Sequence, residues 1–288
     1  MSARLAARVL PLLLGALAPG AAAEVLACGE TAPDASRIAV AGGSLTEILF
    51  DLGAADRVIA VDTTSNYPEA ALGLPQIGYV RNLSAEGLLS LSPTLVLGEH
   101  DMGPPAVVEQ LGTLGVDVLR VPEEFDADGI VAKIRCVAAA VGRPEAGEAL
   151  ITSLDTETPP APAPDAPKGI VVLTLTEGSP LAAGRETSGA GLLRLAGVHN
   201  QLAAMEGWKP VSVEAMAAAA PEFIVITERG VGAAGGMEEL LEHPALRLTP
   251  AARNGRVIAM DGMAMLGFGP RTLESATRLR RALREAAP

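Results

Sequence analysis

Tyr79 and Arg81 are the two residues whose types and spacing offer the clearest chemistry in this chain. They are two apart, so on an extended backbone both side chains point to the same side. A guanidinium beside a phenol favours the phenolate, which is a hard oxygen donor suited to ferric iron, including the iron of ferric haem. Taken alone, the pair favours a plainer interpretation, in which the tyrosine covers a loop beside a solvated arginine.

No catalytic constellation assembles elsewhere in the sequence. The histidines His100, His199 and His243 lie in unrelated contexts, and no serine sits in the GxSxG elbow of a hydrolase nucleophile. The glycine turn at 41–44 has neither the spacing of a dinucleotide fingerprint nor the lysine of a P-loop, and is typical of a strand-to-helix turn. We therefore expect a protein that is not an enzyme.

Composition narrows the classes of partner. The 288 residues are enough for two domains, and a hydrophobic fraction of 49% supplies a large core. A net charge of −12 makes nucleic acid a poor partner, because such binding depends on a basic surface. The chain holds four Phe, one Trp and two Tyr. Of the two tyrosines, Tyr67 precedes a proline in a turn, so Tyr79 is left as the candidate iron ligand.

The first residues predict export. Arg4 and Arg8 precede an apolar run at 9–17, and the three alanines at 21–23 fit a cleavage site. Residues 1–23 are therefore expected to be a signal peptide, and the mature protein a soluble one in the periplasm.

Cys28 and Cys136 are the two cysteines of the chain. An oxidising compartment allows them to form a disulfide that ties the mature N-terminus to a helix of the first domain. A lipoprotein box at 25–28 is an alternative, although Glu24 interrupts its apolar approach, and two unpaired thiols are the remaining one.

Strand and helix patterns alternate along the chain, which predicts an α/β protein with parallel sheets covered on both faces. Ser44 and Glu47 have the spacing of a capping box at the start of the first helix. The helical pattern after residue 131 ends near 154 and is followed by a proline-rich stretch at 158–167. We predict an N-terminal lobe at 24–140, a linking helix and proline-rich connection at 141–168, and a C-terminal lobe at 169–288. The expected strands lie at 37–41, 58–61, 94–97, 116–121, 169–175, 223–226 and 256–260.

One internal repeat supports two similar lobes. Ser84 and Glu86, with a proline seven residues after the acid, are matched 128 residues later by Ser212 and Glu214. Each serine is expected to cap a short helix whose first turn holds the acid, and both acids are expected to be exposed on lobe tips.

These motifs resemble the periplasmic haem-binding proteins of bacterial haem ABC importers. The resemblance covers most of residues 37–285, and it is specific in GYVR at 78–81 and LGFGPRT at 266–272. The serine-acid-proline segments are shared with the wider group of siderophore and cobalamin binding proteins.

The resemblance implies two Rossmann-like lobes joined by a long, rigid linking helix, with one ligand in a cleft between them. It implies that Tyr79 is an axial ligand of haem iron and that Arg81 donates a hydrogen bond to its phenolate oxygen. It also implies that Glu86 and Glu214, one from each lobe, dock onto basic residues of an inner-membrane permease that works with a cytoplasmic ATPase.

The sequence departs from part of this family, because residues 174–178 contain no histidine that would serve a second ligand or a second haem. We therefore expect one five-coordinate haem per protein. Met265 and Phe268 are candidates for the opposite apolar wall, or for core positions. Arg185 and Arg271 are candidates for propionate contacts, or for structural salt bridges.

The sequence thus predicts a monomeric substrate-binding protein that captures haem and delivers it to an ABC permease. A ferric-siderophore or cobalamin carrier on the same scaffold is the first alternative. A two-lobed enzyme such as a nucleotide-sugar transferase is the second, and the export signal and the lack of a phosphate-binding motif count against it.

Overall fold

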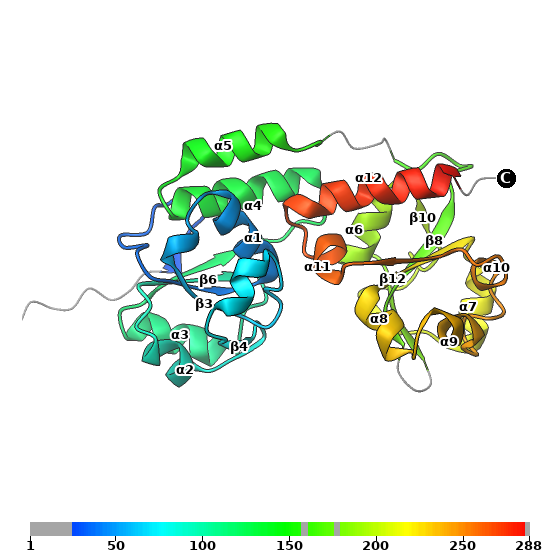
Figure 1. Ribbon diagram of the computed structural model, residues 1–288, viewed down its shortest axis with the longest axis horizontal. Coiled ribbons are helices and arrows are strands. Elements are labelled where there is room, and N and C mark those ends of the chain that lie inside the picture. The colour runs from blue at the N-terminus through cyan, green and yellow to red at the C-terminus, as the bar shows by residue number, and fades with distance from the viewer. Residues whose placement is uncertain (1–24, 157–160, 176–178, 286–288) are drawn as a thin grey trace, which may run out of the picture.

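The computed structural model describes residues 25–156, 161–175 and 179–285, which form two α/β lobes side by side (Figure 1). The expected signal peptide at 1–23 lies outside these residues. We call residues 25–156 the N-lobe and residues 168–285 the C-lobe. Within the described chain, no helix has both the length and the apolar character needed to cross a bilayer.

The N-lobe is built on a wholly parallel sheet in the order β1-β7-β6-β2-β3. Alternate residues of each strand face opposite sides: Ile38 and Val40 join one apolar cluster with α1 and α4, while Ala39 and Ala41 join another under α2 and α3. The β-branched strands and the two-sided cover are those expected from the sequence. The elements are β1 (Val25–Leu26), β2 (Ile38–Ala41), α1 (Gly43–Asp51), η1 (Ala55–Arg57), β3 (Val58–Val61), η2 (Glu69–Gly73), β4 (Gly78–Tyr79), β5 (Asn82–Leu83), α2 (Ala85–Ser90), β6 (Leu95–Glu99), α3 (Pro105–Thr113), β7 (Asp117–Val121), α4 (Ala127–Ala140) and α5 (Pro144–Ser153).

The C-lobe sheet is mixed, which corrects the expectation of two parallel sheets. Strands β10, β8, β12 and β13 pair in parallel, but β9 runs antiparallel to β8, and β11 antiparallel to β9. Trp208 begins the edge strand β11 and packs on the core. The elements are β8 (Lys168–Leu175), β9 (Pro180–Ala183), α6 (Ser188–Leu195), β10 (His199–Asn200), β11 (Trp208–Pro210), α7 (Val213–Ala219), β12 (Phe223–Thr227), α8 (Glu228–Ala233), α9 (Met237–Glu242), α10 (Pro250–Arg253), β13 (Val257–Met260), α11 (Gly262–Leu266) and α12 (Pro270–Glu285).

The connection between the lobes differs from the expected long helix. The helical pattern is broken at Gly142, which has a φ of 66°, and α5 restarts with Pro144 at its first position. A left-handed glycine ends one helix and a proline is well placed to begin the next. The link therefore includes the ten-residue helix α5, packed on α4, and residues 161–167 before β8 lie outside any helix.

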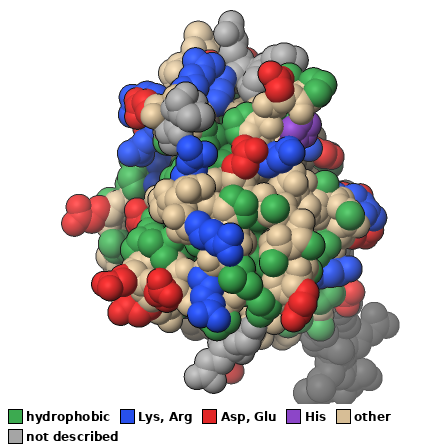
Figure 2. Space-filling view, turned by 90° about the vertical axis from the view of Figure 1, so that its right-hand side faces the viewer, with side chains coloured by type: hydrophobic (Ala, Val, Ile, Leu, Met, Phe, Trp, Pro, Cys, Tyr) green, Lys and Arg blue, Asp and Glu red, His purple; other side chains and the backbone are tan. Residues whose placement is uncertain are grey.

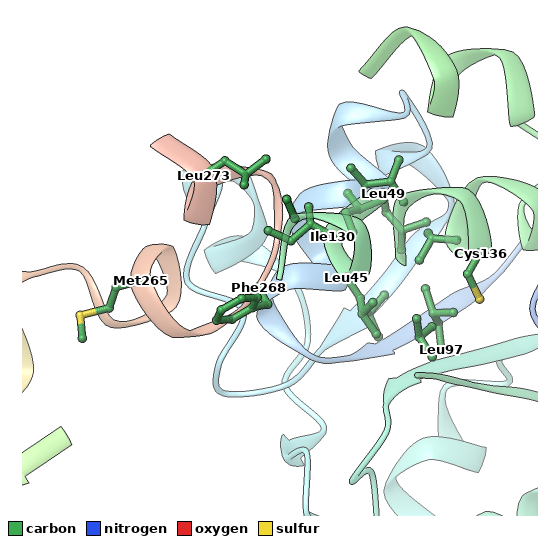
Figure 3. Close-up of a cluster of buried hydrophobic side chains, with 14 of the residues drawn as sticks. Leu45, Leu49, Leu97, Ile130, Cys136, Met265, Phe268 and Leu273 are labelled. Atoms are coloured by element: carbon green, nitrogen blue, oxygen red, sulfur yellow. The ribbon is translucent and has the colours of Figure 1, made fainter. Parts of the chain in front are cut away.

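A single apolar cluster runs through both lobes and holds them together. It contains Leu45 and Ile130 of the N-lobe as well as Leu192 and Val225 of the C-lobe. Phe268, which follows α11, points from the C-lobe chain toward Leu45 and Ile130 (Figure 3). The two lobes thus share one apolar cluster, and each lobe has a second cluster of its own.

Charged side chains of both signs are interspersed over the outer end of the C-lobe (Figure 2). Several acidic side chains gather at the lower left of this view, and Lys and Arg side chains are spread over the rest of the face.

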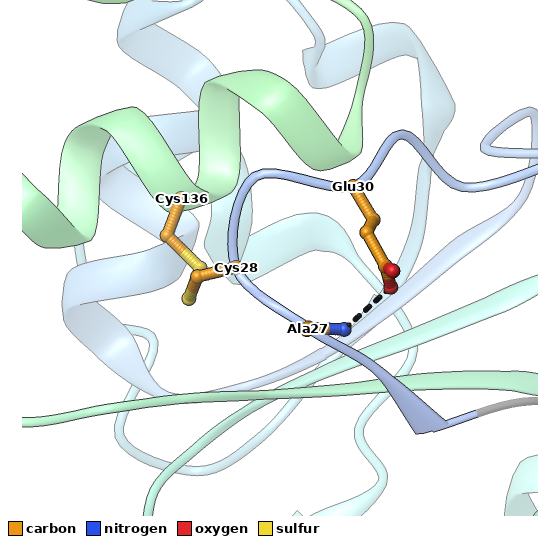
Figure 4. Close-up of a disulfide and its surroundings, with 4 residues drawn as sticks. All are labelled: Ala27, Cys28, Glu30 and Cys136. Atoms are coloured by element: carbon orange, nitrogen blue, oxygen red, sulfur yellow. Dashed lines mark hydrogen bonds between the residues drawn. A yellow bond between two sulfur atoms is a disulfide. The ribbon is translucent and has the colours of Figure 1, made fainter.

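The expected disulfide is present between Cys28 and Cys136, which are 108 residues apart in the sequence (Figure 4). It ties the segment after β1 to α4, and Glu30 accepts a hydrogen bond of 2.8 Å from the Ala27 amide beside it. The bond engages the sulfur of Cys28 that a lipid anchor would need.

Replacing both cysteines by serine is expected to lower the free energy of unfolding by about 2–5 kcal/mol, because the bond restricts the unfolded chain. Urea unfolding followed by circular dichroism measures the change, with the reduced wild-type protein as the matched control. An unfolding midpoint equal to that of the oxidised wild type would contradict this prediction.

Candidate functional site

Tyr79 lies on a small antiparallel hairpin of the N-lobe. In this hairpin Tyr79 pairs with Asn82 and Gly78 with Leu83, so that Val80 and Arg81 form the turn. Val80 is buried, whereas the tyrosine is 43% exposed. In Figure 1, β4 lies on the side of the N-lobe that is turned toward the C-lobe.

A buried carboxylate fixes this hairpin to the sheet. Asp62 directly follows β3 and is fully buried. One of its oxygens accepts the Val80 amide at 3.2 Å, and the other accepts the Ser65 hydroxyl at 2.9 Å. The Asp62 carboxylate also accepts the Gly42 amide at 3.1 Å, so one side chain joins the hairpin to the start of α1.

This arrangement explains why the expected capping box is wrong. Helix α1 begins at Gly43 with Gly42 as its N-cap and has no side-chain cap of its own. Asp62 accepts the Gly42 amide, and Thr64 accepts the Gly43 amide at 3.0 Å. Because residues from another loop satisfy these donors, Ser44 and Glu47 make other contacts.

Arg81 lies against the ring of Tyr79 and is paired with an acid. Its guanidinium carbon is 5.9 Å from the centre of the Tyr79 ring. Its Nε and Nη2 atoms both lie 2.5 Å from Oδ2 of Asp101. Among the described residues, Arg81 makes no hydrogen bond to the Tyr79 hydroxyl, so the donor implied by the resemblance is close by but engaged elsewhere.

The N-lobe also holds a buried charged cluster, formed by Lys133, Glu123 and Glu99 together with Ser44. The ammonium of Lys133, on α4, donates to Glu123 at 2.8 Å, to Ser44 at 3.2 Å and to the carbonyl oxygen of Gly267 at 3.1 Å. The Ser44 hydroxyl donates in turn to Glu99 at 3.1 Å. Burial raises the pKa of Glu99 to about 7, although the charge of Lys133 opposes the shift.

Arg271 forms a second contact between the lobes. Of the two roles expected for it, a propionate contact or a structural salt bridge, it has the salt bridge in this structure. Its Nε donates to Glu47 at 3.0 Å, its Nη2 pairs with the same carboxylate, and its Nη1 lies 3.3 Å from Asp261. The guanidinium also stacks on Tyr67 at 3.9 Å. Burial raises the pKa of Glu47 even though the hydrogen bond and charge of Arg271 lower it. This arginine is held by the N-lobe and is not a free propionate partner.

Met265 and Phe268 lie in the core of this structure, which favours the second of the two roles expected for them. Both side chains are fully buried. Phe268 packs edge-on against Phe125 with ring centres 5.2 Å apart. A side chain at Gly269 would meet Ser44 at 3.0 Å, so the backbone packs closely against α1 at this point.

The other expected residues lie on the surface. Arg185 pairs with Glu206, again as a salt bridge. Glu86 and Glu214 are exposed in the first turns of α2 and α7, which Ser84 and Ser212 cap as expected (helices: Figure 1). Hydrogen bonds from its own backbone and from Ser212 hold the pKa of Glu214 below its usual value.

Two hollows lie along α12, with volumes of about 350 and 610 Å³. The first lies against β13, and the second lies between α12 and α5. Neither is lined by Tyr79 or Arg81, so the site is an exposed surface of the N-lobe and not one of these hollows.

Three acidic side chains that contact the hairpin or the buried charged cluster were not candidates from the sequence: Asp62, Glu99 and Asp101. Each lies at or just beyond the carboxyl end of a parallel strand, where ligand-binding residues gather in α/β sheets. That position was the available signal. Lys133 was missed as well, although a lysine within the buried stripe of α4 is itself unusual.

The chain is similar to known periplasmic binding proteins in both sequence and structure. The family model described as periplasmic binding protein matches residues 38–264. The solved periplasmic haem-binding protein BhuT, in complex with two haems, is 39% identical, with a TM-score of 0.79 over 87% of this chain and 98% of its own. RhuT from Roseiflexus sp. RS-1, a periplasmic haem-binding protein in apo form, is 35% identical, with a TM-score of 0.82 over 88% of this chain and 100% of its own.

Curated relatives are more distant or shorter matches. An uncharacterized ABC transporter substrate-binding lipoprotein, YvrC of Bacillus subtilis, is 25% identical over 82% of this chain and 76% of its own. Vitamin B12-binding protein of Yersinia pestis is 32% identical over 102 residues, which are 35% of this chain and 36% of that protein.

Glu99→Gln is expected to stabilise the protein at pH 8 and to leave it little changed at pH 4.5. A pKa raised from 4.5 to about 7 means that the folded state holds a proton which the unfolded chain releases over this range. The resulting stability is complete below pH 4.5 and is lost as the pH rises through 7, by about 3 kcal/mol at most. Urea unfolding at both pH values measures it. An equal pH dependence in the variant would contradict the assignment.

Proposed function

Because the chain belongs to the periplasmic binding protein family, we propose that it captures haem in the periplasm and delivers it to an inner-membrane ABC permease. The observation that carries the proposal is Tyr79, an exposed phenol held on an anchored hairpin beside the guanidinium of Arg81. A phenolate oxygen is one of the axial ligands by which proteins hold haem iron.

The binding step uses this chain's own groups as follows. Tyr79 provides an anionic oxygen to the iron, and the positive charge of Arg81 favours that anion over the neutral phenol. The hairpin is held by Asp62, so the phenol is presented without reorganisation of the loop. Protonating the phenolate releases the iron, which suits a protein that must hand its ligand on.

We propose that the protein is a monomer and binds one haem. Two tyrosines are exposed, but the arginine beside Tyr67 is Arg271, which joins the two lobes. Tyr79, beside Arg81, is therefore the one candidate ligand for iron. Two haems, as in the solved BhuT complex, are the competing stoichiometry. A cobalamin or siderophore ligand is the alternative that the match to vitamin B12-binding protein supports.

We propose that the two lobes meet the permease through Glu86 and Glu214. Helices α2 and α7 both lie in the lower part of Figure 1, away from the shared core that runs under α4 and α12. One exposed acid on each lobe gives the permease two points of contact. Residues 1–23 are proposed to be the signal that directs export.

Tyr79→Phe is expected to abolish the tyrosinate-to-iron absorption band of the hemin-loaded protein, because the ring stays while the ligand oxygen is lost. Hemin titration followed by visible absorption measures both the band and the stoichiometry, which should be one. Tyr67→Phe is the matched control, since it removes the other exposed tyrosine. An unchanged band in the Tyr79 variant would overturn the proposal, and a cobalamin or ferric-siderophore complex formed in place of hemin would favour the alternative.

Glu86→Arg combined with Glu214→Arg is expected to leave hemin affinity unchanged and to reduce haem uptake through the permease by about tenfold or more, because like charges meet at the contact. Glu145→Arg is the matched control, because it reverses an exposed first-turn acid on α5. Uptake equal to that of the control would contradict the docking role.

A further inference from the structure

We propose that Asp101 is a positioning residue that holds the guanidinium of Arg81 against Tyr79 and so sets how tightly the phenolate oxygen binds iron. This role rests on the proposed function. Asp101 is not a candidate from the sequence, and it touches neither Tyr79 nor the expected iron position in any contact described above.

The ion pair has an oriented geometry. Nε and Nη2 of Arg81 both approach the same oxygen, Oδ2 of Asp101, at 2.5 Å. Nε carries a single hydrogen, so this contact fixes the plane and the direction of the guanidinium. The hydrogens of Nη1 remain available on the other side of the group. A guanidinium held in this way lies over the Tyr79 ring, 5.9 Å from its centre.

Backbone hydrogen bonds fix the loop that carries Asp101 relative to the hairpin. The loop after β6 makes two hydrogen bonds to the hairpin: the Gly103 amide donates to Val80 at 3.0 Å, and the Leu83 amide donates to Gly103 at 2.9 Å. Met102, next to Asp101, is almost fully buried. The position of Asp101 relative to the hairpin is therefore built into the fold.

The two partners differ in exposure. The side chain of Arg81 is 62% exposed, and that of Asp101 is 22% exposed. A long exposed arginine usually samples many rotamers, and its ion pairs contribute little because holding them costs side-chain entropy. Here Asp101 is the less exposed partner, and its loop is hydrogen-bonded to the hairpin. Less side-chain entropy is therefore lost when the ion pair forms, and the pair can orient the guanidinium of Arg81.

The hydrogen bonding of the Asp101 carboxylate also points to Arg81. The second oxygen, Oδ1, is buried and has no hydrogen-bond partner in the described chain. All side-chain hydrogen bonds that this carboxylate makes there go to one guanidinium. Glu99 attracts the same guanidinium by its charge, but it hydrogen-bonds Ser44 and not Arg81. Asp101 is thus the group that determines where Arg81 points.

The test is a double-mutant cycle on hemin binding by the full chain, with Asp101→Ala, Arg81→Ala and the double variant. Asp101→Ala is expected to weaken hemin binding by about tenfold and to shift the tyrosinate-to-iron band as Arg81→Ala does, because the positive charge that favours the phenolate is then no longer held beside Tyr79. In the double variant the loss should equal that of Arg81→Ala alone. Asp101→Asn keeps the shape and one acceptor oxygen, and should fall between.

A band and an affinity equal to those of the wild type in Asp101→Ala would overturn the positioning role, and so would losses that add in the double variant. Circular dichroism checks that each variant is folded, and if Asp101→Ala is not, the cycle is run with Asp101→Asn. Glu148→Ala is the matched control, because it breaks the ion pair of Arg135 far from Tyr79. If the wild type itself forms no hemin complex, the proposed function fails; if it does while Asp101→Ala is unaffected, only the role of Asp101 fails.

Discussion

The close packing of residues 266–271 against the start of α1 is the constraint on which the rest of the structure depends. Phe268 enters the core of the N-lobe, Gly269 lies against Ser44, and Arg271 reaches Glu47. Lys133 reaches back from the N-lobe to the Gly267 carbonyl oxygen. Apolar burial, a buried ammonium and a bidentate ion pair thus act at one joint, so the lobes are held in a single arrangement. A ligand that binds at Tyr79 meets a surface of the N-lobe that is already formed.

The topology of the N-lobe sheet explains why the polar residues around Tyr79 lie together. The carboxyl ends of β3 and β6 bring Asp62, Glu99 and Asp101 to one edge of the N-lobe sheet, beside the hairpin that carries Tyr79. Asp62 anchors the hairpin and Glu99 joins the buried hydrogen bonds of Ser44. Asp101, by our proposal, directs Arg81. Polar groups with distinct tasks are therefore supported from the same edge of one sheet.

Much of this fold was predictable because its signals are local. Strand β3 was predicted with its observed bounds from four apolar residues, and Ser84 caps its helix as its spacing indicated. The errors arise where a distant residue decides. The cap of α1 comes from Asp62, twenty residues on, and Phe268 is core because a second lobe covers it. Apolar residues that face a ligand and those that face another lobe have the same sequence pattern, so only the assembled structure separates them.

The most direct test of the central claim is a crystal structure of the hemin-loaded protein with iron located by its anomalous scattering. We expect one iron per chain, bonded to the phenol oxygen of Tyr79, with Arg81 beside that oxygen. Iron bonded to His100, the exposed neighbour of Asp101, or two irons in stacked haems with Tyr79 unbound, would contradict it.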